Sequence, residues 1–204
     1  MSNDLTTKTE TALAANTAMP SGLDGAGNDF LMPRFKVWHP MSKTEVVNAK
    51  LGLWYEANGA SLAGDTMRFY LLSQKNRSFT QDDGKVKNYK YLLIAKEGNL
   101  DFPCEIVLSA SGIRPVKGLN TTLMERKLTD KAASTFQYLI EAKIEVKEND
   151  NGKFGVPKFT IAEVADGEAF DKVAGLHAHY AAEYALDKGG VDSATAYDEK
   201  EIPV

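Results

Sequence analysis

The chain has 204 residues, of which 43% are hydrophobic and 25% charged, and its formal net charge is −4. This length can bury the core of one domain, and no apolar run approaches the roughly 18 residues that a membrane span needs. A single cysteine, Cys104, excludes an internal disulfide, so we expect a cytoplasmic protein whose thiol is buried and is not a nucleophile.

The negative charge is concentrated at the two ends of the chain. Residues 1–27 carry one Lys against three acidic residues, and residues 187–204 carry two Lys against five. Residues 1–27 also lack aromatic side chains, which predicts a disordered N-terminal arm. We therefore expect a folded domain over 28–186 and an acidic, flexible C-terminal tail over 187–204.

Short strand-like segments fill the first half of the domain. The first, FLMPRFKVW, alternates between an apolar face and a face with two cations and an aromatic ring. The second face consists of Arg34, Lys36 and Trp38. Further segments are TEVVNA, LGLWYEA, DTMRFYLLSQ, KVKNYKYLLIAKE and CEIVLSAS, separated by turn signals such as Asp83-Gly84. Such spacing is typical of a barrel or a sandwich.

Two helices are expected in the second half. In RPVKGLNTTLMERKLTDKAA, Asn120 or Thr121 would cap a helix that carries Leu123, Met124 and Leu128 on one side. In DGEAFDKVAGLHAHYAAEYALDKGG, apolar residues recur at helical spacing until a glycine stop at residues 189 and 190.

A long hairpin lies between these helices. FQYLIEAKIEV alternates strictly, with Phe136 and Val146 at the two ends of its apolar face, and the turn ENDNGK joins it to FGVPKFTIAEV. Asn-Gly between two strands is a strong hairpin signal. Pro157 is expected at an edge or a bulge, because it cannot donate to a strand ladder.

Signals for catalysis are missing. The chain contains no GxxxxGK[ST], GxGxxG, GxSxG or CxxC motif. His177 and His179 are two residues apart on a predicted helix and point in nearly opposite directions, so they cannot hold one metal ion together. We expect no enzyme activity, no cofactor and no metal site.

Basic and aromatic residues are interleaved between residues 66 and 90. Six Lys and Arg stand there against two Asp. Single-stranded nucleic acid needs this combination, because cations follow the phosphates and rings stack on bases at roughly 1–3 kcal/mol each. We predict a DNA-binding site formed by Arg34, Lys36, Trp38, Arg68, Tyr70, Lys75, Arg77, Phe79, Lys85, Lys87 and Tyr89.

Four further residues are weaker candidates for the same site. Trp54 and Tyr55 would either contact DNA or pack inside, because LGLWYEA suits a core strand equally well. Arg114 and Lys117 would lead the DNA backbone toward the helix or only cap that helix.

The chain resembles phage-encoded single-stranded DNA-binding proteins of the OB-fold type. The matching segments are GLDGAGNDFLMPRFKVWHPMS, PCEIVLSASGIRPVKGLNTTL and FQYLIEAKIEVKENDNGKFGVPKFTIAEV, in the same order as in that family. The resemblance implies a mainly β (α+β) fold: an OB-like barrel with a long hairpin, one inserted helix, a C-terminal helix and flexible termini. It also implies binding of single-stranded DNA without strong sequence preference, for phage DNA replication or recombination in the host cytoplasm.

The chain ends in YDEKEIPV, which is similar to the acidic terminus of bacterial single-stranded DNA-binding proteins that closes on Ile-Pro-Phe and recruits replication and repair partners. The resemblance implies a partner-binding tail formed by Asp198, Glu199, Glu201, Ile202, Pro203 and Val204. Val204 replaces the terminal Phe, and Lys200 interrupts the acidic run. A flexible anion would also compete with DNA for a basic face.

Two other functions stay open on the sequence alone. The basic hairpin would also suit a phage factor that acts on a host protein without binding nucleic acid, because protein interfaces favour aromatic residues and Arg. The other is a metal enzyme with an unrecognised site. The expected partners are single-stranded DNA and, through the tail, replication or recombination proteins, with no membrane. A homo-oligomer is left open.

Overall fold

The computed structural model describes residues 32–37, 50–57, 61–81, 83–150 and 152–186. The predicted arm over 1–27, the segment TEVVNA and the predicted tail over 187–204 lie outside the described residues. The domain boundaries therefore stay predictions.

Most of the described residues belong to one eight-stranded sheet. Its strands are β1 (Arg34–Val37), β2 (Trp54–Glu56), β3 (Ser61–Gly64), β4 (Thr66–Thr80), β5 (Val86–Lys96), β6 (Asn99–Ser109), β7 (Tyr138–Asn149) and β8 (Gly152–Val164). Their order across the sheet is β3-β2-β1-β6-β5-β4-β7-β8. The α-helices are α2 (Ile113–Thr129) and α3 (Gly167–Leu186), and the short 3-10 turns are η2 (Ala110–Gly112) and η3 (Thr135–Gln137).

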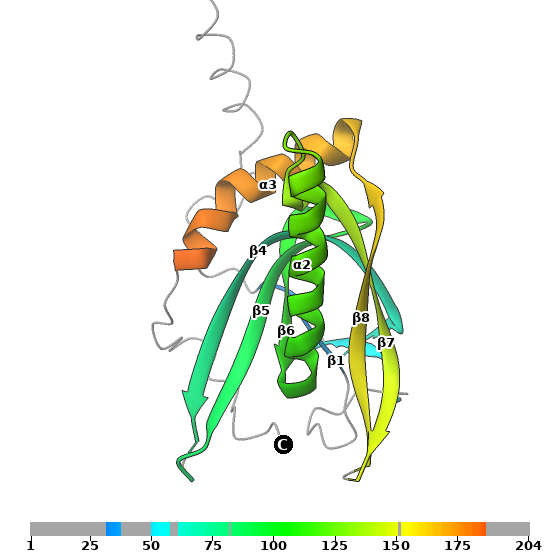
Figure 1. The fold of residues 1–204 in the computed structure, drawn as a ribbon, viewed down its shortest axis with the longest axis vertical. Helices are drawn as coiled ribbons and strands as arrows, with labels where there is room; N and C mark the ends of the chain where they lie inside the picture. Colours follow the sequence, from blue (N-terminus) through cyan, green and yellow to red (C-terminus); the bar gives the residue numbers. More distant parts are fainter. Residues whose placement is uncertain (1–31, 38–49, 58–60, 82, 151, 187–204) are drawn as a thin grey trace, which may run out of the picture.

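The sheet curls into an open half-barrel (Figure 1). Strands β4, β5 and β6 form an antiparallel meander, α2 follows, and β7 returns to pair with β4 before the β7–β8 hairpin. Five strands connected in this way, with the helix between the third and fourth, have the arrangement of an OB fold. The predicted mainly β, OB-like class with an inserted helix, a long hairpin and a C-terminal helix is confirmed. The sheet stays open because β1 pairs in parallel with β6, at the edge where a closed barrel would join to β8.

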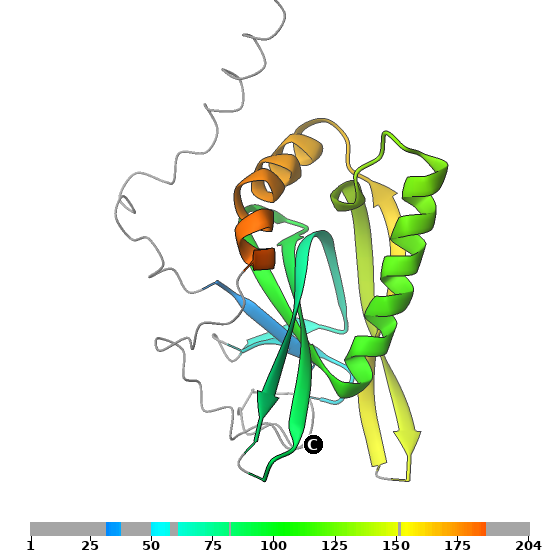
Figure 2. The ribbon, with the colours of Figure 1, turned by 60° about the vertical axis from the view of Figure 1, so that its left-hand side comes forward.

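The two helices lie on opposite faces of the sheet (Figure 2). On β5, Leu92 packs in a core with Val116 of α2, whereas its neighbour Leu93 packs in a second core with Val173 of α3. We call these the α2 face and the α3 face. Because β5 is buried on both, its run YLLIA is continuously apolar instead of alternating.

A bulge in β4 changes the face to which its side chains point. Leu71 lies opposite Ile94 of β5, but Ser73 lies opposite Leu93, so Leu72 is an extra residue in the strand. Because side chains alternate with a period of two, one extra residue moves every later side chain to the other face.

Contacts on each side of the sheet confirm this change. The Ser73 hydroxyl donates to the Ala181 carbonyl of α3 over 3.1 Å. Its neighbour Gln74 exchanges two hydrogen bonds of 3.1 Å with Asn120 of α2. Beyond the bulge, odd-numbered residues of β4 therefore lie on the α3 face.

Helix α2 begins earlier than the sequence predicted. The prediction that Asn120 or Thr121 caps it is wrong, because both residues lie within the helix. The overlooked start signal is Pro115, which lies in the first turn, where a missing N–H costs no hydrogen bond.

The buried side of α2 also differs from the prediction. Val116, Leu119 and Leu123 are buried at a spacing of three and four residues. Met124 and Leu128 are 57% and 69% exposed, so only Leu123 of the predicted apolar side reaches the core. Helix α3 forms where it was predicted, and its predicted stop at Gly189 lies outside the described residues. No described helix is long and apolar enough to cross a membrane.

The β7–β8 hairpin is confirmed, with Gly152 at φ +111° after the turn. Pro157 lies on β8, the last strand of the sheet, and its side chain is buried. It therefore lies on an edge strand, one of the two positions predicted for it. The prediction is wrong for the two residues at the ends of the apolar face, Phe136 and Val146. Phe136 lies in η3 and packs beside the α3-face core. Val146 is 50% exposed, because β7 has there run past the α2-face core in which Ile144 lies.

The curl brings β8 against β1 at a glycine. A Cβ built on Gly155 would lie 2.8 Å from Cγ1 of Val37 in β1 and 3.0 Å from Cγ2 of Ile144 in β7. Carbon atoms cannot approach this closely, so the half-barrel narrows here only because residue 155 has no side chain.

We expect Gly155→Ala to lower the free energy of unfolding by about 1–3 kcal/mol, the usual cost of overpacking a core. Urea denaturation should show a lower midpoint with an unchanged slope. The control is Gly118→Ala in α2, where a Cβ meets no atom within 4 Å. The control should gain about 0.5–1 kcal/mol from helix propensity. Equal midpoints for the two variants would contradict the contact between β8 and β1.

Candidate functional site

Cationic and aromatic side chains gather on the α3 face of the β4–β5 hairpin. The opposed pairs are Lys75 with Tyr91, Arg77 with Tyr89, and Phe79 with Lys87. Arg34 of β1 lies on the same face, opposite Glu105 of β6. We call the following set the cation–ring surface: Arg34, Lys75, Arg77, Phe79, Lys87, Tyr89 and Tyr91.

Tyr91 lies at the centre of this surface. Its ring centroid is 5.3 Å from Cζ of Arg77, 6.0 Å from Cζ of Arg34 and 6.0 Å from Nζ of Lys75. These distances are within the reach of cation–π attraction, about 6 Å. Nζ of Lys75 also lies 3.9 Å from the ring centroid of Tyr184, near the end of α3. Three cations thus share one buried ring.

The carboxylate of Glu105 balances part of the positive charge of these three cations. The carboxylate is 5% exposed and accepts hydrogen bonds from Nε of Arg34 at 2.7 Å and from the hydroxyl of Tyr184 at 2.6 Å. Burial and the neighbouring carboxylate raise the pKa of Tyr184 above its usual value, so the phenol stays a donor. This network connects β1 and α3 to β6.

Phe79, Tyr89, Arg77 and Lys87 form the part of the cation–ring surface nearest the β4–β5 turn. Phe79 is half-buried and meets the Tyr89 ring edge to face, with centroids 5.5 Å apart. Tyr89 itself is 5% exposed. Arg77 and Lys87 are half-buried on either side, so the hairpin presents cations around one accessible ring.

Two predicted site residues, Arg68 and Tyr70, lie near the start of β4, away from the β4–β5 turn. Arg68 forms ion pairs with Glu97 at 3.0 Å and with Glu163 at 2.7 Å, so carboxylates already surround its charge. Tyr70 is 6% exposed and packs in the α3-face core. The structure does not bring these two side chains together with the open end of the hairpin.

The other predicted site residues flank the surface. Lys36 shares the parity of Arg34 on β1, opposite the core residue Phe35, as the alternation predicted. Lys85 is exposed beside the hairpin turn and pairs with Asp83 at 3.0 Å. Trp38 lies outside the described residues, so its role stays a prediction.

The weaker candidates separate into two groups. Trp54 is fully buried, and its indole N–H donates to the Ala142 carbonyl at 3.0 Å. Tyr55 is 4% exposed, so LGLWYEA is a core segment. Arg114 and Lys117 are exposed on the first turns of α2, which packs on the other face of the sheet.

Sequence reasoning missed three residues of the site: Tyr91, Glu105 and Tyr184. Tyr91 was detectable, because it follows Tyr89 at the same parity in the strand. Glu105 and Tyr184 lie 79 positions apart in the sequence, and no local pattern links them.

Cys104 is buried, and His177 and His179 pack against aromatic rings. Burial raises the pKa of the Cys104 thiol to about 11, which agrees with the predicted buried thiol. His177 stacks on Phe136 at 4.3 Å, and His179 packs edge-on against Tyr180. Within the described ranges, no group of three or more His, Cys, Asp or Glu side chains could hold a metal ion.

Comparisons with known proteins add little to this geometry. No family model and no curated protein matches the chain. One similar solved structure is the second OB-fold domain of replication protein A from Methanococcus maripaludis, with 14% sequence identity. The match covers 50% of this chain and 86% of that domain, with a TM-score of 0.23. A likeness at this score supports no conclusion about function, so the site rests on its own contacts.

We expect Tyr184→Phe to lower the free energy of unfolding by about 1.5–3 kcal/mol, because it removes a buried hydrogen bond to a charged acceptor. Urea denaturation near pH 7 measures the change. Tyr180→Phe, one turn earlier on α3, is the matched control and should stay within about 0.5 kcal/mol of the parent protein. If both variants unfold alike, the bond to Glu105 does not hold α3 on the sheet.

Proposed function

We propose that this protein binds single-stranded DNA, without strong sequence preference and without catalysis, on the cation–ring surface. The observation that carries the proposal is the convergence of Arg34, Lys75 and Arg77 on the Tyr91 ring. The setting implied by the sequence resemblance is phage DNA replication or recombination.

The cluster of cations favours an anionic ligand. Like charges held close together repel one another, which destabilises the free protein. Within the cluster, the buried carboxylate of Glu105 pairs with Arg34. A ligand that brings further negative charge would relieve the repulsion, and a phosphate backbone does so along its whole length.

The position of the surface favours a nucleic acid among anionic ligands. OB folds bind oligonucleotides on the face of their second and third strands and through the loop between the first two. Strands β5 and β6 and the β4–β5 turn occupy those positions here. Half-buried Phe79 adds a ring on which a base can stack, with Arg77 and Lys87 beside it for phosphates.

The proposed contacts fall into two groups. Lys75, Arg77, Lys87 and the flanking Lys36 and Lys85 would bind phosphates, and Phe79 and Trp38 would stack on bases. Tyr89 and Tyr91 are buried, and Arg34 pairs with the buried Glu105, so these three would orient the other groups. Arg68 and Tyr70, which lie among acidic partners or in the core, take a lesser part.

We expect the double substitution Arg77→Gln and Lys87→Gln to weaken binding of oligo-dT, oligo-dC and mixed sequences equally. If both cations contact phosphate, the slope of log K against log salt should become shallower by about 1.4, since each contact with single strands contributes roughly 0.7. Fluorescence anisotropy with labelled oligonucleotides at several salt concentrations measures both quantities.

The matched control removes two positive charges elsewhere, with Lys143→Gln on β7 and Lys172→Gln on α3, both exposed. Its affinity and salt slope should stay close to those of the parent protein. Equal effects of the two double variants would mean that DNA responds only to net charge. If the parent protein fails to bind any oligonucleotide, the proposal is wrong and a protein-binding module becomes the better explanation.

We also expect removal of residues 192–204 to leave the melting temperature unchanged and to tighten binding of single-stranded DNA by on the order of 1 kcal/mol at low salt. This segment contains four acidic residues and one Lys, and it would compete with DNA for the cations. The gain should shrink at high salt, where screening weakens the competition. Unchanged affinity at low salt would show the segment to be inert toward the site.

A further inference from the structure

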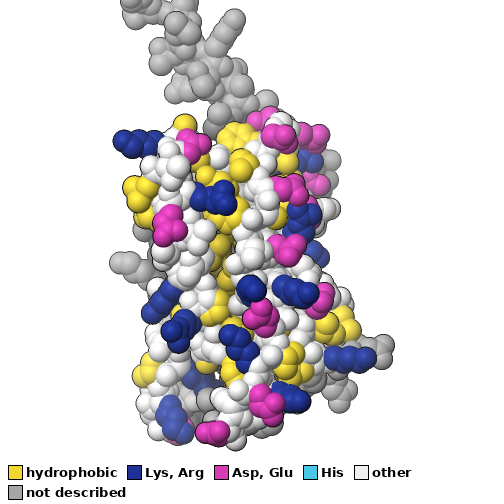
Figure 3. Space-filling view, turned by 45° about the vertical axis from the view of Figure 1, so that its right-hand side comes forward, with side chains coloured by type: hydrophobic (Ala, Val, Ile, Leu, Met, Phe, Trp, Pro, Cys, Tyr) yellow, Lys and Arg dark blue, Asp and Glu magenta, His cyan; other side chains and the backbone are white. Residues whose placement is uncertain are grey.

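A groove runs between α2 and the outer edge of the β7–β8 hairpin. Two hollows of about 510 and 580 Å³ share Pro115, Lys147 and Val156 in their walls and so form one continuous groove. In the space-filling view of Figure 3, hydrophobic side chains form a strip along this face, with Lys and Arg side chains on both sides and Asp and Glu side chains among them.

The lining of the groove is apolar at its floor and basic at its rim. Leu119, Val156, Phe159 and Ile161 contribute to the floor. The cations in its walls are Arg114, Arg126, Lys147 and Lys158. The acidic side chain among the lining residues is Glu145, which pairs with Lys158 at 3.2 Å. The excess of positive charge therefore extends along the whole groove.

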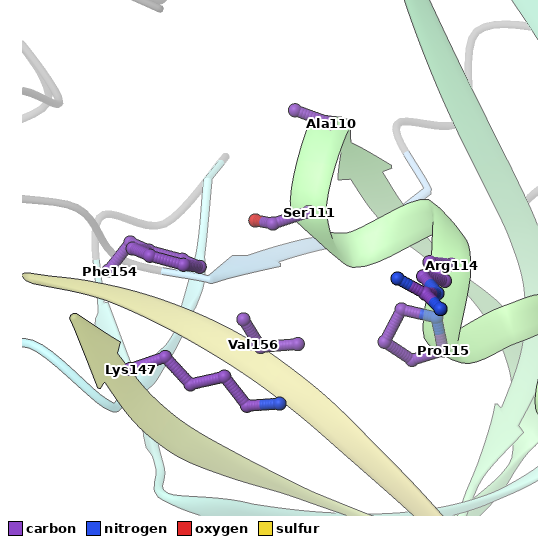
Figure 4. Close-up of a pocket in the computed structure, with 7 residues that line it drawn as sticks. All are labelled: Ala110, Ser111, Arg114, Pro115, Lys147, Phe154 and Val156. Carbon is purple, nitrogen blue, oxygen red and sulfur yellow. The ribbon is translucent and has the colours of Figure 1, made fainter. Parts of the chain in front are cut away.

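The groove begins where the cation–ring surface ends. Tyr89 lies opposite Ser109, the last residue of β6, and the next two residues, Ala110 and Ser111, line the first hollow. Both residues belong to the 3-10 turn η2, which rises about 2 Å per residue, so the first hollow lies directly beside the end of β6. In Figure 4, Ser111 and Arg114 face Phe154, Val156 and Lys147 across the opening. Ala110 has a φ of +41°, a strained backbone at the junction between the two surfaces.

From this continuity we infer that single-stranded DNA leaving the cation–ring surface passes Ser111 and enters the groove between α2 and β8. Arg114 and Lys147 bind phosphates on opposite walls, and Phe154, half-buried on β8, stacks on a base. The inference rests on the proposed function and extends it, because it adds a second part of the DNA path on another side of the molecule.

Gly118 offers a direct probe of the groove. It lines the second hollow, and a Cβ at this position meets no atom within 4 Å. Gly118→Glu and Gly118→Gln place side chains of nearly equal size there, and both improve helix propensity, so both variants should fold. The pair differs in the negative charge that DNA would meet.

The experiment measures anisotropy with two labelled oligo-dT probes, of about 6 and about 20 nucleotides, since one OB fold covers roughly 4–16 nucleotides. For the long probe, we expect Gly118→Glu to raise Kd on the order of tenfold over Gly118→Gln, as loss of one or two stacked or paired nucleotides would. For the short probe, held by the cation–ring surface, the two variants should agree within about twofold.

Each other outcome has a distinct meaning. If the parent protein binds neither probe, the proposed function fails. If it binds both probes and the two variants agree on the long one, the groove is not part of the DNA path and only this inference fails. Equal weakening on both probes would also overturn it, because the groove would then act through the whole fold. If a labelled peptide of residues 192–204 binds the parent but not Gly118→Glu while long-probe affinity is unchanged, the groove binds acidic peptide instead.

Discussion

The extra residue in β4 determines what the α3 face can do. Arg68 and Tyr70 lie on that face before the bulge, and Lys75, Arg77 and Phe79 lie on it afterward, although the two sets differ in parity. Without Leu72 as the extra residue, the second set would point toward α2, where apolar side chains fill the space. The bulge therefore determines that the cations form a basic surface and are not buried as charges in the core.

The cations of this surface contact aromatic rings, and Arg34 also pairs with the carboxylate of Glu105. Glu105 is fixed between Arg34 and Tyr184, which joins the first strand, the third strand of the meander and the last helix. Tyr91 supports three cations with its ring instead of with a charge. A cluster of like charges trades stability of the free protein for attraction of an anion, as binding sites often do.

The two proposed parts of the DNA path lie on different sides of the same end of the sheet. Helix α3 covers one end of the α3 face and extends past only part of the β4–β5 hairpin (Figures 1 and 2). Helix α2 covers the core on the other face, and the groove lies between α2 and β8. The groove borders the outer edge of β8, which the incomplete barrel leaves at the end of the sheet. A fully closed barrel would pair the outer edge of β8 and remove the groove.

The sequence by itself determined the local elements: the alternation of β1, the Asn-Gly hairpin, the edge position of Pro157 and the span of α3 all follow from side-chain period and turn chemistry. It also identified the four cations of the cation–ring surface, because charged residues can be read directly from the sequence. The bulge at Leu72 and the contact of Gly155 with Val37 were decided by the tertiary structure. So was the bond between Glu105 and Tyr184. Each of these depends on which segments, distant in the chain, share one space, and periodicity within a single segment carries no information about its neighbours.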